Sequence, residues 1–296
     1  MRRCFSSLVI ALLVAADAAA EPQYQYLQAL GDTRYHVVES TFTEQRYHLF
    51  VRLPEDYEES TESYPVVYLL DGGWLYPLLL GYYKYLKAGD EVPSMIIVGI
   101  SYGTDDFRQG NNRSTDYTAP SVEREHWGGA AKFQQALTAE VLPLIEATYR
   151  ARKDRRILFG QSIGGQFVLY AALTEPQLFW GYIASNPALH RNLPYFLERH
   201  NDPKMSVDAR VFVASGSEDD ATFREPALQW MRHWTSVEPP PWPLCAADLT
   251  GHSHFSAPPA AFRDGIRWLF DADVPGANCR LASASSGSDP RVSLPR

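Results

Sequence analysis

Residues 157–170 read Ile-Leu-Phe-Gly-Gln-Ser-Ile-Gly-Gly-Gln-Phe-Val-Leu-Tyr, and this stretch decides the fold. An apolar run that ends at Phe159 leads into the pattern G-x-S-x-G, and a helix-like stretch follows. A strand, a sharp turn and a helix in this order form a nucleophile elbow, which lifts a serine hydroxyl clear of the backbone. Glycines are needed around Ser162 because such a turn leaves little room for side chains. The pattern predicts an activated serine if the rest of the chain supplies the matching sheet.

The segments around the elbow alternate between strand-like and helix-like patterns. Two stretches near the start alternate apolar and polar residues, as in an antiparallel hairpin with one face buried. From Tyr64 onward the strand-like runs are almost continuously apolar, which strands buried on both faces of a parallel sheet require. The predicted strands are 35–40, 47–53, 66–70, 95–100, 156–159, 182–185, 210–214 and 244–249, and the predicted helices are 74–86, 130–149, 165–173, 188–200, 223–234 and 258–270.

This order of segments predicts an α/β protein with the α/β-hydrolase fold. We expect a mostly parallel eight-stranded sheet, an antiparallel hairpin at its N-terminal edge and helices on both faces. A chain of 296 residues is long enough for one such domain. The polar, aperiodic segment 102–127 is predicted to be a loop over the top of the sheet, where long loops usually serve function.

The N-terminus has the pattern of a secretory signal peptide. Arg2 and Arg3 precede an apolar run from Phe5 to Ala15, and Ala18-Ala19-Ala20 forms a cleavage site. The apolar run is too short to span a membrane. The expected organisation is a signal peptide over 1–20, an α/β-hydrolase domain over 21–278 and a disordered Ser/Gly-rich tail over 279–296. The pattern predicts a periplasmic or secreted protein without membrane attachment after cleavage, the alternative being an uncleaved N-terminal anchor.

Charge and cysteine content narrow the functional class. The formal net charge is −8 and no basic run is present, so a nucleic-acid partner is not expected. Loss of the signal peptide removes Cys4 and leaves Cys245 and Cys279. In an oxidising compartment these two could form a disulfide, or they could remain as two buried thiols.

A nucleophilic serine needs a histidine to accept its proton and a carboxylate to orient that histidine. In this fold the acid follows the penultimate strand and the histidine follows the last strand. The histidine is His254 or His252, and His254 is favoured because His252 would lie in the turn itself. For the acid we rank Asp219 first, Glu218 second and Asp220 third, since some acidic residues here could merely begin a helix.

The developing oxyanion needs two hydrogen-bond donors. One is predicted to be the N–H of Ile163, directly after the serine, and the other the N–H of Gly72 or Gly73 after the strand 66–70. An ordinary strand-to-helix turn would also explain the glycine pair. A metal site built from His252, His254 and the acidic run is a weaker alternative, because it leaves the elbow and the glycine pair unexplained.

Several motifs resemble those of the putative esterase family of α/β-hydrolases. Its members include siderophore esterases, S-formylglutathione hydrolase, feruloyl esterases and mycolyltransferases. The resemblance extends from about Tyr35 to Phe270, and it looks strongest toward the periplasmic siderophore-esterase branch. The motifs that carry it are Tyr68-Leu69-Leu70-Asp71-Gly72, Arg113-Ser114-Thr115-Asp116-Tyr117-Thr118, Gly128-Gly129-Ala130, Lys132-Phe133, 158–165 and His254-Phe255-Ser256.

The resemblance implies that Ser162 is the nucleophile and His254 the base, whereas the acid varies within the branch. Gln161 stands where many relatives carry histidine, which suggests altered substrate contacts. Arg113 with Asp116 implies either a local ion pair that pins the loop or a substrate contact. Trp74, like the other tryptophans, is explained either by packing in the core or a lid or by a contact with the substrate.

The sequence therefore predicts a serine esterase that hydrolyses siderophore-type or other small acyl esters through an acyl-enzyme. It needs no cofactor and no metal. Two alternatives share these residues: an acyltransferase that admits an alcohol in place of water, and an inactive binding protein of the same fold. The pattern does not indicate the oligomeric state.

Overall fold

The computed structural model describes residues 32–198 and 208–270 together with Leu30 and Cys279. The predicted signal peptide and residues 280–296 of the predicted tail lie outside the described residues. Eight strands form one sheet in the order β1-β2-β4-β3-β5-β6-β7-β8. They are β1 (Arg34–Glu39), β2 (Arg46–Arg52), β3 (Tyr64–Leu69), β4 (Ile96–Ser101), β5 (Ala151–Gln161), β6 (Gly181–Ser185), β7 (Arg210–Gly216) and β8 (Leu244–Leu249).

The pairing confirms the predicted hairpin and the predicted parallel sheet. β1 and β2 pair antiparallel, and β2 pairs antiparallel with β4. From β4 to β8 every neighbouring pair is parallel. The strand β5 lies between β3 and β6, with Leu158 opposite Tyr68 on one side and Tyr182 on the other. The elbow at the end of β5 is therefore surrounded by the carboxyl ends of other parallel strands.

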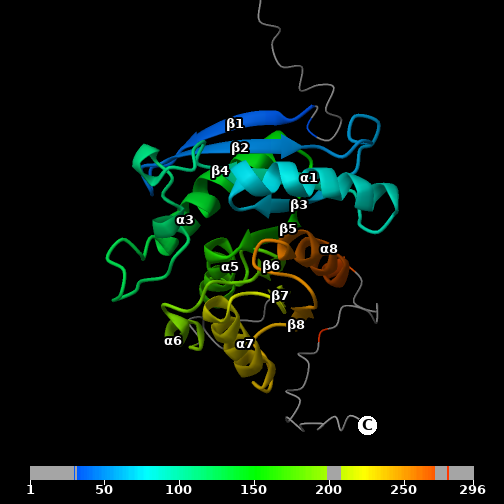
Figure 1. Ribbon diagram of the computed structural model, residues 1–296. Coiled ribbons are helices and arrows are strands. Elements are labelled where there is room, and N and C mark those ends of the chain that lie inside the picture. Colours follow the sequence, from blue (N-terminus) through cyan, green and yellow to red (C-terminus); the bar gives the residue numbers. More distant parts are fainter. Residues whose placement is uncertain (1–29, 31, 199–207, 271–278, 280–296) are drawn as a thin grey trace, which may run out of the picture.

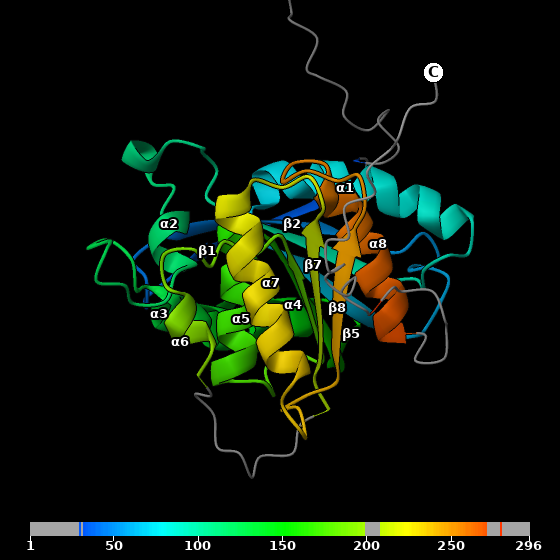
Figure 2. The same ribbon diagram turned by 60° about the horizontal axis from the view of Figure 1, so that its bottom comes forward.

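Helices cover both faces of the sheet, as predicted (Figures 1 and 2). α1 (Gly72–Ala88) and α8 (Ala257–Phe270) lie together on one face and pack over Val67, Ile97 and Ile183. The other helices cover the opposite face, where a larger apolar cluster includes Phe133, Phe167 and Trp230. They are α3 (Ala130–Ala136), α4 (Leu142–Thr148), α5 (Ile163–Thr174), α6 (Leu193–Phe196) and α7 (Ala221–Thr235).

The predicted helix 188–200 is wrong in extent. Within its described part only α6 is helical. A helix from 188 would bond the carbonyl of Ala188 to the N–H of Asn192. This carbonyl instead accepts from Nε2 of Gln166, and the N–H of Asn192 donates to the carbonyl of Leu189. The predicted helix 130–149 is confirmed, with a π-helical turn η3 (Leu137–Val141) between α3 and α4.

The segment 102–127 is mostly irregular, as predicted, but it contains two short helical turns. These are η2 (Phe107–Gln109) and α2 (Arg113–Asp116). Cys245 in β8 and Cys279 form a disulfide, with their Cα atoms 4.7 Å apart. No helix among the described residues is long and apolar enough to cross a membrane.

Candidate active site

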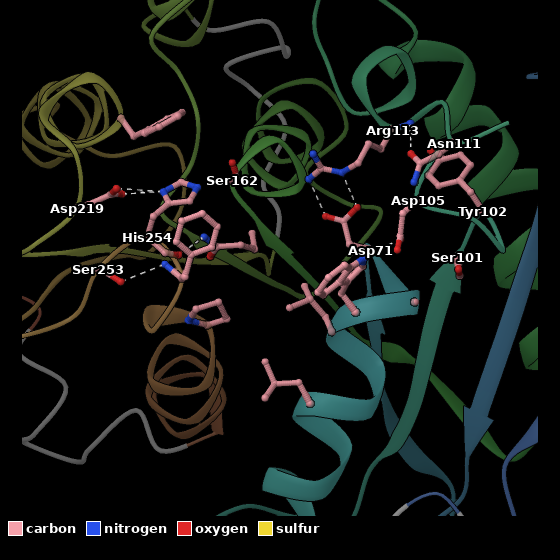
Figure 3. Close-up of a pocket in the computed structure, with 18 of the residues that line it drawn as sticks. Asp71, Ser101, Tyr102, Asp105, Asn111, Arg113, Ser162, Asp219, Ser253 and His254 are labelled. Carbon is pink, nitrogen blue, oxygen red and sulfur yellow. Dashed lines mark hydrogen bonds and ion pairs between the residues drawn. The ribbon is translucent and has the colours of Figure 1, made fainter. Parts of the chain in front are cut away.

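A cavity of about 780 Å³ opens at the carboxyl ends of the parallel strands. This edge of an open α/β sheet is where ligands commonly bind. The cavity is lined by residues that follow β3, β4, β5, β7 and β8, including Ser162, Asp219 and His254. Figure 3 shows this arrangement, with His254 and Asp219 on one side and Asp71 and Arg113 on the other. Residues about 180 positions apart in the chain thus share one cavity.

Ser162 sits in the strained turn that the sequence predicts. Its backbone has φ 58° and ψ −117°, directly after β5 and before α5. Its N–H donates to the carbonyl of Ser185 at the end of β6, and its carbonyl accepts from the N–H of Gln166 and of Ala188, each at 3.0 Å. A Cβ on Gly160 would lie 2.3 Å from the carbonyl oxygen of Gly164, so the turn requires glycine there. The surrounding backbone therefore stabilises an otherwise unfavourable conformation.

His254 and Asp219 form a close pair beside the serine. The Nδ1 atom of His254 lies 2.9 Å from Oδ2 and 3.1 Å from Oδ1 of Asp219. The Asp219 side chain is 1% exposed and that of His254 is 13% exposed. A buried carboxylate bonded to Nδ1 fixes the imidazole tautomer and leaves Nε2 free to accept a proton. The described residues include no hydrogen bond between Ser162 and His254; such bonds are often long before substrate binds.

The structure distinguishes between the competing candidates. Glu218 is exposed at the cavity rim, and Asp220 caps α7 by accepting from the N–H of Thr222 at 2.8 Å. Hydrogen bonds from Thr222 lower the pKa of Asp220. His252 does not line the cavity, and its Nδ1 is 3.1 Å from the carbonyl oxygen of Ser256. In the described ranges no group of three histidine, cysteine or acidic side chains is arranged to hold a metal ion.

Two side-chain amides hold the loop that carries His254. The Nε2 of Gln161 donates to the carbonyl of His254 at 2.7 Å, and the Nδ2 of Asn186 donates to the same oxygen at 3.2 Å. The Oδ1 of Asn186 accepts from the N–H of Gly216 at 2.7 Å. These bonds connect the ends of β5, β6 and β7 to the histidine loop. Gln161, predicted as a substrate contact, lines the cavity and also contacts the backbone of the candidate base.

The candidate oxyanion donors differ in their surroundings. Gly73 lines the cavity, whereas Gly72 is buried behind it. A Cβ on Gly72 would lie 2.6 Å from the backbone of Gly99 and Ile100, so Gly72 allows α1 to approach β4 closely. Both residues are in the first turn of α1, where N–H groups have no acceptor within the helix. Gly73 is therefore the better placed of the two. Ile163, the other predicted donor, is the first residue of α5 and directly follows Ser162.

Of the two alternatives for Arg113 and Asp116, the local ion pair between them is wrong. Arg113 instead binds Asp71 through two hydrogen bonds, Nε to Oδ1 at 2.7 Å and Nη2 to Oδ2 at 2.8 Å. Burial alone would lower the pKa of Arg113, but the Asp71 carboxylate raises it above its ordinary value. Sequence proximity favours Asp116, whereas the fold brings the end of β3 to α2. Arg113 and Asp71 both line the cavity.

Asp116, the last residue of α2, is instead buried. It accepts hydrogen bonds from the hydroxyls of Tyr47 at 2.7 Å and Tyr102 at 2.9 Å. Burial raises the pKa of this carboxyl, and the two tyrosine bonds act in the opposite direction. The cluster anchors α2 to β2 and to the end of β4, and so it holds Arg113 at the cavity.

Apolar side chains form the wall between α1 and α8. Trp74 is 69% exposed, and its Nε1 donates to Oδ1 of Asp105 at 2.7 Å. Leu78 lies one turn further along α1, and Phe255 is 88% exposed across the cavity. Phe223 of α7 packs on the His254 ring with centroids 4.6 Å apart. The cavity thus offers an apolar and aromatic surface beside the candidate serine.

Sequence reasoning missed Asn186 and Arg224. The guanidinium of Arg224 donates to the carbonyl of Gly216 at 2.8 Å and binds Asp248 at 3.0 and 3.1 Å. It thereby joins the end of β7, which precedes Asp219, to the end of β8, which precedes His254. Asn186 could have been found from the sequence, because it is a polar residue that directly follows a buried strand.

Comparisons with known proteins identify the family of the chain. The family model described as "Putative esterase" matches residues 40–238. The ferri-bacillibactin esterase BesA of Bacillus subtilis is 31% identical over 182 residues, which are 56% of this chain and 62% of the relative. The match therefore spans less than two thirds of that relative. The apo-salmochelin esterase of Escherichia coli O6:H1 is 26% identical over 236 residues, 73% of each chain.

Solved structures share the fold. An IroE-like serine hydrolase from Shewanella oneidensis superposes with a TM-score of 0.71 at 26% identity, covering 81% of this chain and 80% of that one. The BES protein from Bacillus cereus gives a TM-score of 0.71 at 21% identity and covers 91% of this chain and 99% of that one, which shows a common fold.

Proposed function

Because the chain belongs to the putative esterase family, we propose that it is a serine esterase that hydrolyses siderophore-type acyl esters through an acyl-enzyme. The observation that carries the serine mechanism is the His254–Asp219 pair, at 2.9 Å, in the same cavity as Ser162 on its strained elbow. The substrate class rests on the relatives, several of which are siderophore esterases.

In the proposed reaction the Oγ of Ser162 attacks the ester carbonyl carbon while Nε2 of His254 takes the hydroxyl proton. The carbonyl electron pair moves onto oxygen, where the N–H groups of Ile163 and Gly73 stabilise the negative charge. The intermediate collapses, the bond to the alcohol breaks, and His254 returns the proton to the leaving alkoxide. Water then attacks the acyl-serine through the same steps and releases the acid. Asp219 holds the imidazole and stabilises its charged form without becoming protonated.

The proposal also includes export of the enzyme from the cytoplasm. The N-terminal pattern is that of a signal peptide, and the disulfide between Cys245 and Cys279 is typical of proteins in oxidising compartments. We therefore expect the enzyme to work in the periplasm or outside the cell, on a small-molecule ester.

The test is covalent labelling of the purified protein by a fluorophosphonate, read by intact mass. Wild type should gain one adduct, and Ser162→Ala should gain none. His254→Ala should label at least about a thousandfold more slowly, because the serine loses its base. His252→Ala is the matched control and should label like wild type. A folded wild-type protein that stays unlabelled would overturn the serine mechanism and favour a binding protein of the same fold.

The substrate is tested separately by incubating wild type and Ser162→Ala with a catecholate trilactone and following ring opening by mass spectrometry. Stepwise appearance of the linear esters with wild type alone supports the proposal. If wild type is labelled by the fluorophosphonate but leaves the trilactone intact, the serine mechanism stands and the siderophore assignment fails.

A further inference from the structure

The cavity around Ser162 is strongly acidic. Its lining includes five carboxylates, those of Asp71, Asp105, Glu218, Asp219 and Asp220. Among the described residues that line it, the only arginine or lysine is Arg113. The charge of the lining is therefore dominated by negative groups on both sides of the candidate serine.

The single guanidinium is already paired with a carboxylate of the same cavity. Arg113 uses Nε and Nη2 to bind both oxygens of Asp71, and its guanidinium lies 5.9 Å from the Tyr117 ring centroid. An ion pair of this kind cancels most of the positive field that an anionic ligand would meet. A bidentate partner also occupies the face that would otherwise bind a carboxylate or catecholate.

The remaining carboxylates are not neutralised. Asp105 accepts from the uncharged indole N–H of Trp74, and Asp220 accepts from a backbone N–H. Glu218 is exposed at the rim. Asp219 is paired with His254, which must be neutral at Nε2 to act as a base. The side-chain charges that line the cavity are consequently negative on balance in the state that begins the reaction.

The other wall of the cavity is apolar. Trp74, Leu78 and Phe255 are exposed around the opening, at 69%, 49% and 88%. Exposed large apolar side chains that gather around a cavity favour an aromatic or aliphatic ligand. The acidic lining and the apolar side chains together select against a negatively charged ester and favour an uncharged, apolar one.

From this arrangement we infer that the site takes uncharged aromatic or apolar esters and discriminates against anionic ones. The inference rests on the proposed esterase function and narrows it. An iron-free catecholate ester is uncharged when its catechols are protonated, whereas three catecholate dianions around Fe³⁺ leave a triply negative complex. The enzyme should therefore cleave the iron-free ester in preference to its ferric complex.

The test compares two small probes of similar shape, methyl 4-acetoxybenzoate and 4-acetoxybenzoate, which differ in one negative charge. Wild type at low ionic strength should favour the uncharged probe in kcat/KM by about tenfold beyond the ratio of their hydroxide-catalysed rates. Raising the salt to about 0.5 M should reduce this preference, because salt screens exposed charges.

The informative variant is Asp105→Asn/Glu218→Gln, in which asparagine can still accept from Trp74. It should lower the preference for the uncharged probe about threefold at low salt. The matched control is Glu59→Gln/Glu62→Gln, which changes the net charge equally. These exposed residues precede β3 and so lie at the opposite edge of the sheet. The control should keep the wild-type preference.

Ferric and iron-free catecholate trilactones extend the test to the proposed substrate. The iron-free form should be opened at least about tenfold faster by wild type, and the gap should narrow in Asp105→Asn/Glu218→Gln. Equal rates on charged and uncharged probes, insensitive to salt and to these substitutions, would overturn the inference and leave the esterase proposal intact. If wild type hydrolysed neither the charged nor the uncharged probe, the inference and the esterase proposal would both be overturned.

Discussion

At the scale of single residues, the position of Asp219 explains why the acid could be narrowed but not chosen from sequence. Glu218, Asp219 and Asp220 are adjacent, and only the direction of the backbone after β7 decides which side chain turns inward. In the structure Asp219 is buried against His254, and its neighbours are exposed. The histidine was easier to choose, because the length of the loop after β8 already favoured His254 over His252.

Asp219→Asn should reduce kcat about 10³- to 10⁴-fold, because an amide can donate to Nδ1 and so favours the wrong tautomer of His254. KM should change little, since Asp219 is covered by the imidazole. On an uncharged ester, the loss of kcat in Glu218→Gln should be at least about a hundredfold smaller than the loss in Asp219→Asn. Steady-state kinetics of the two variants on methyl 4-acetoxybenzoate would decide, and similar losses would show that the assignment of the acid is wrong.

Gln161 is a positioning residue in this structure, because its amide donates to the carbonyl of His254. Gln161→Leu should lower kcat about fivefold and leave KM within about twofold, since one hydrogen bond of about 1 kcal/mol no longer holds the base. Gln161→His, which can still donate to that carbonyl, should recover most of kcat. A change mainly in KM for Gln161→Leu would instead indicate a direct substrate contact, as the sequence suggested.

At the scale of secondary-structure elements, the sequence predicted the strands well because buried parallel strands are short apolar runs between polar turns. It failed where tertiary contacts determine the backbone. Residues 188–192 do not extend α6 because Ala188 binds the elbow and Asn192 has φ −153°. The strand β5 extends from Ala151, well before the predicted start at Arg156, because Ala151 already pairs with Tyr64 at the start of β3.

The contact between α1 and β4 gives a prediction about packing. Gly72→Ala would place a methyl group 2.6 Å from the backbone of Gly99 and Ile100, which cannot move aside as a side chain could. We expect a loss of about 2 to 3 kcal/mol in the free energy of unfolding, measured by urea denaturation. Gly73→Ala is the control, because its nearest neighbour is the Ser101 hydroxyl at 3.2 Å. A loss of the same size in both variants would contradict this account.

The segment between β6 and α6 should make stability sensitive to pH through His190. Burial lowers the pKa of His190 below its usual 6.5, with a further contribution from Arg191. The unfolded chain therefore binds the proton more readily, and the stability of the wild type should fall as pH drops below about 6.5. His190→Gln cannot take up this proton and should lose less stability between pH 7.5 and 5. Urea denaturation at the two pH values measures the difference, and parallel losses would contradict it.

At the scale of the whole molecule, the sheet brings together residues that are far apart in the chain. The ends of β3, β5, β7 and β8 each contribute one part of the site, so the fold itself creates the cavity. The sequence could predict these parts because the chain order of serine, acid and histidine follows from the fold. It could not predict the cross-connections through Asn186 and Arg224, which depend on how neighbouring strand ends are oriented.

The disulfide gives a prediction for the molecule as a whole, because it links β8, the last strand of the sheet, to a residue beyond α8. Cys245 and Cys279 are separated by 34 positions, and closing a loop of that length stabilises a chain by about 3 to 4 kcal/mol in the loop-entropy model. Cys279→Ser should lower the free energy of unfolding by about this amount, and a reductant should destabilise wild type to the same degree while leaving the variant unaffected. Ser162 directly follows β5, and the strands β6 and β7 separate β5 from β8 in the sheet, so labelling by the fluorophosphonate should persist under conditions where the variant is folded. If reductant leaves the unfolding of wild type unchanged, the bond contributes nothing to stability, and its support for an oxidising compartment would be lost with it.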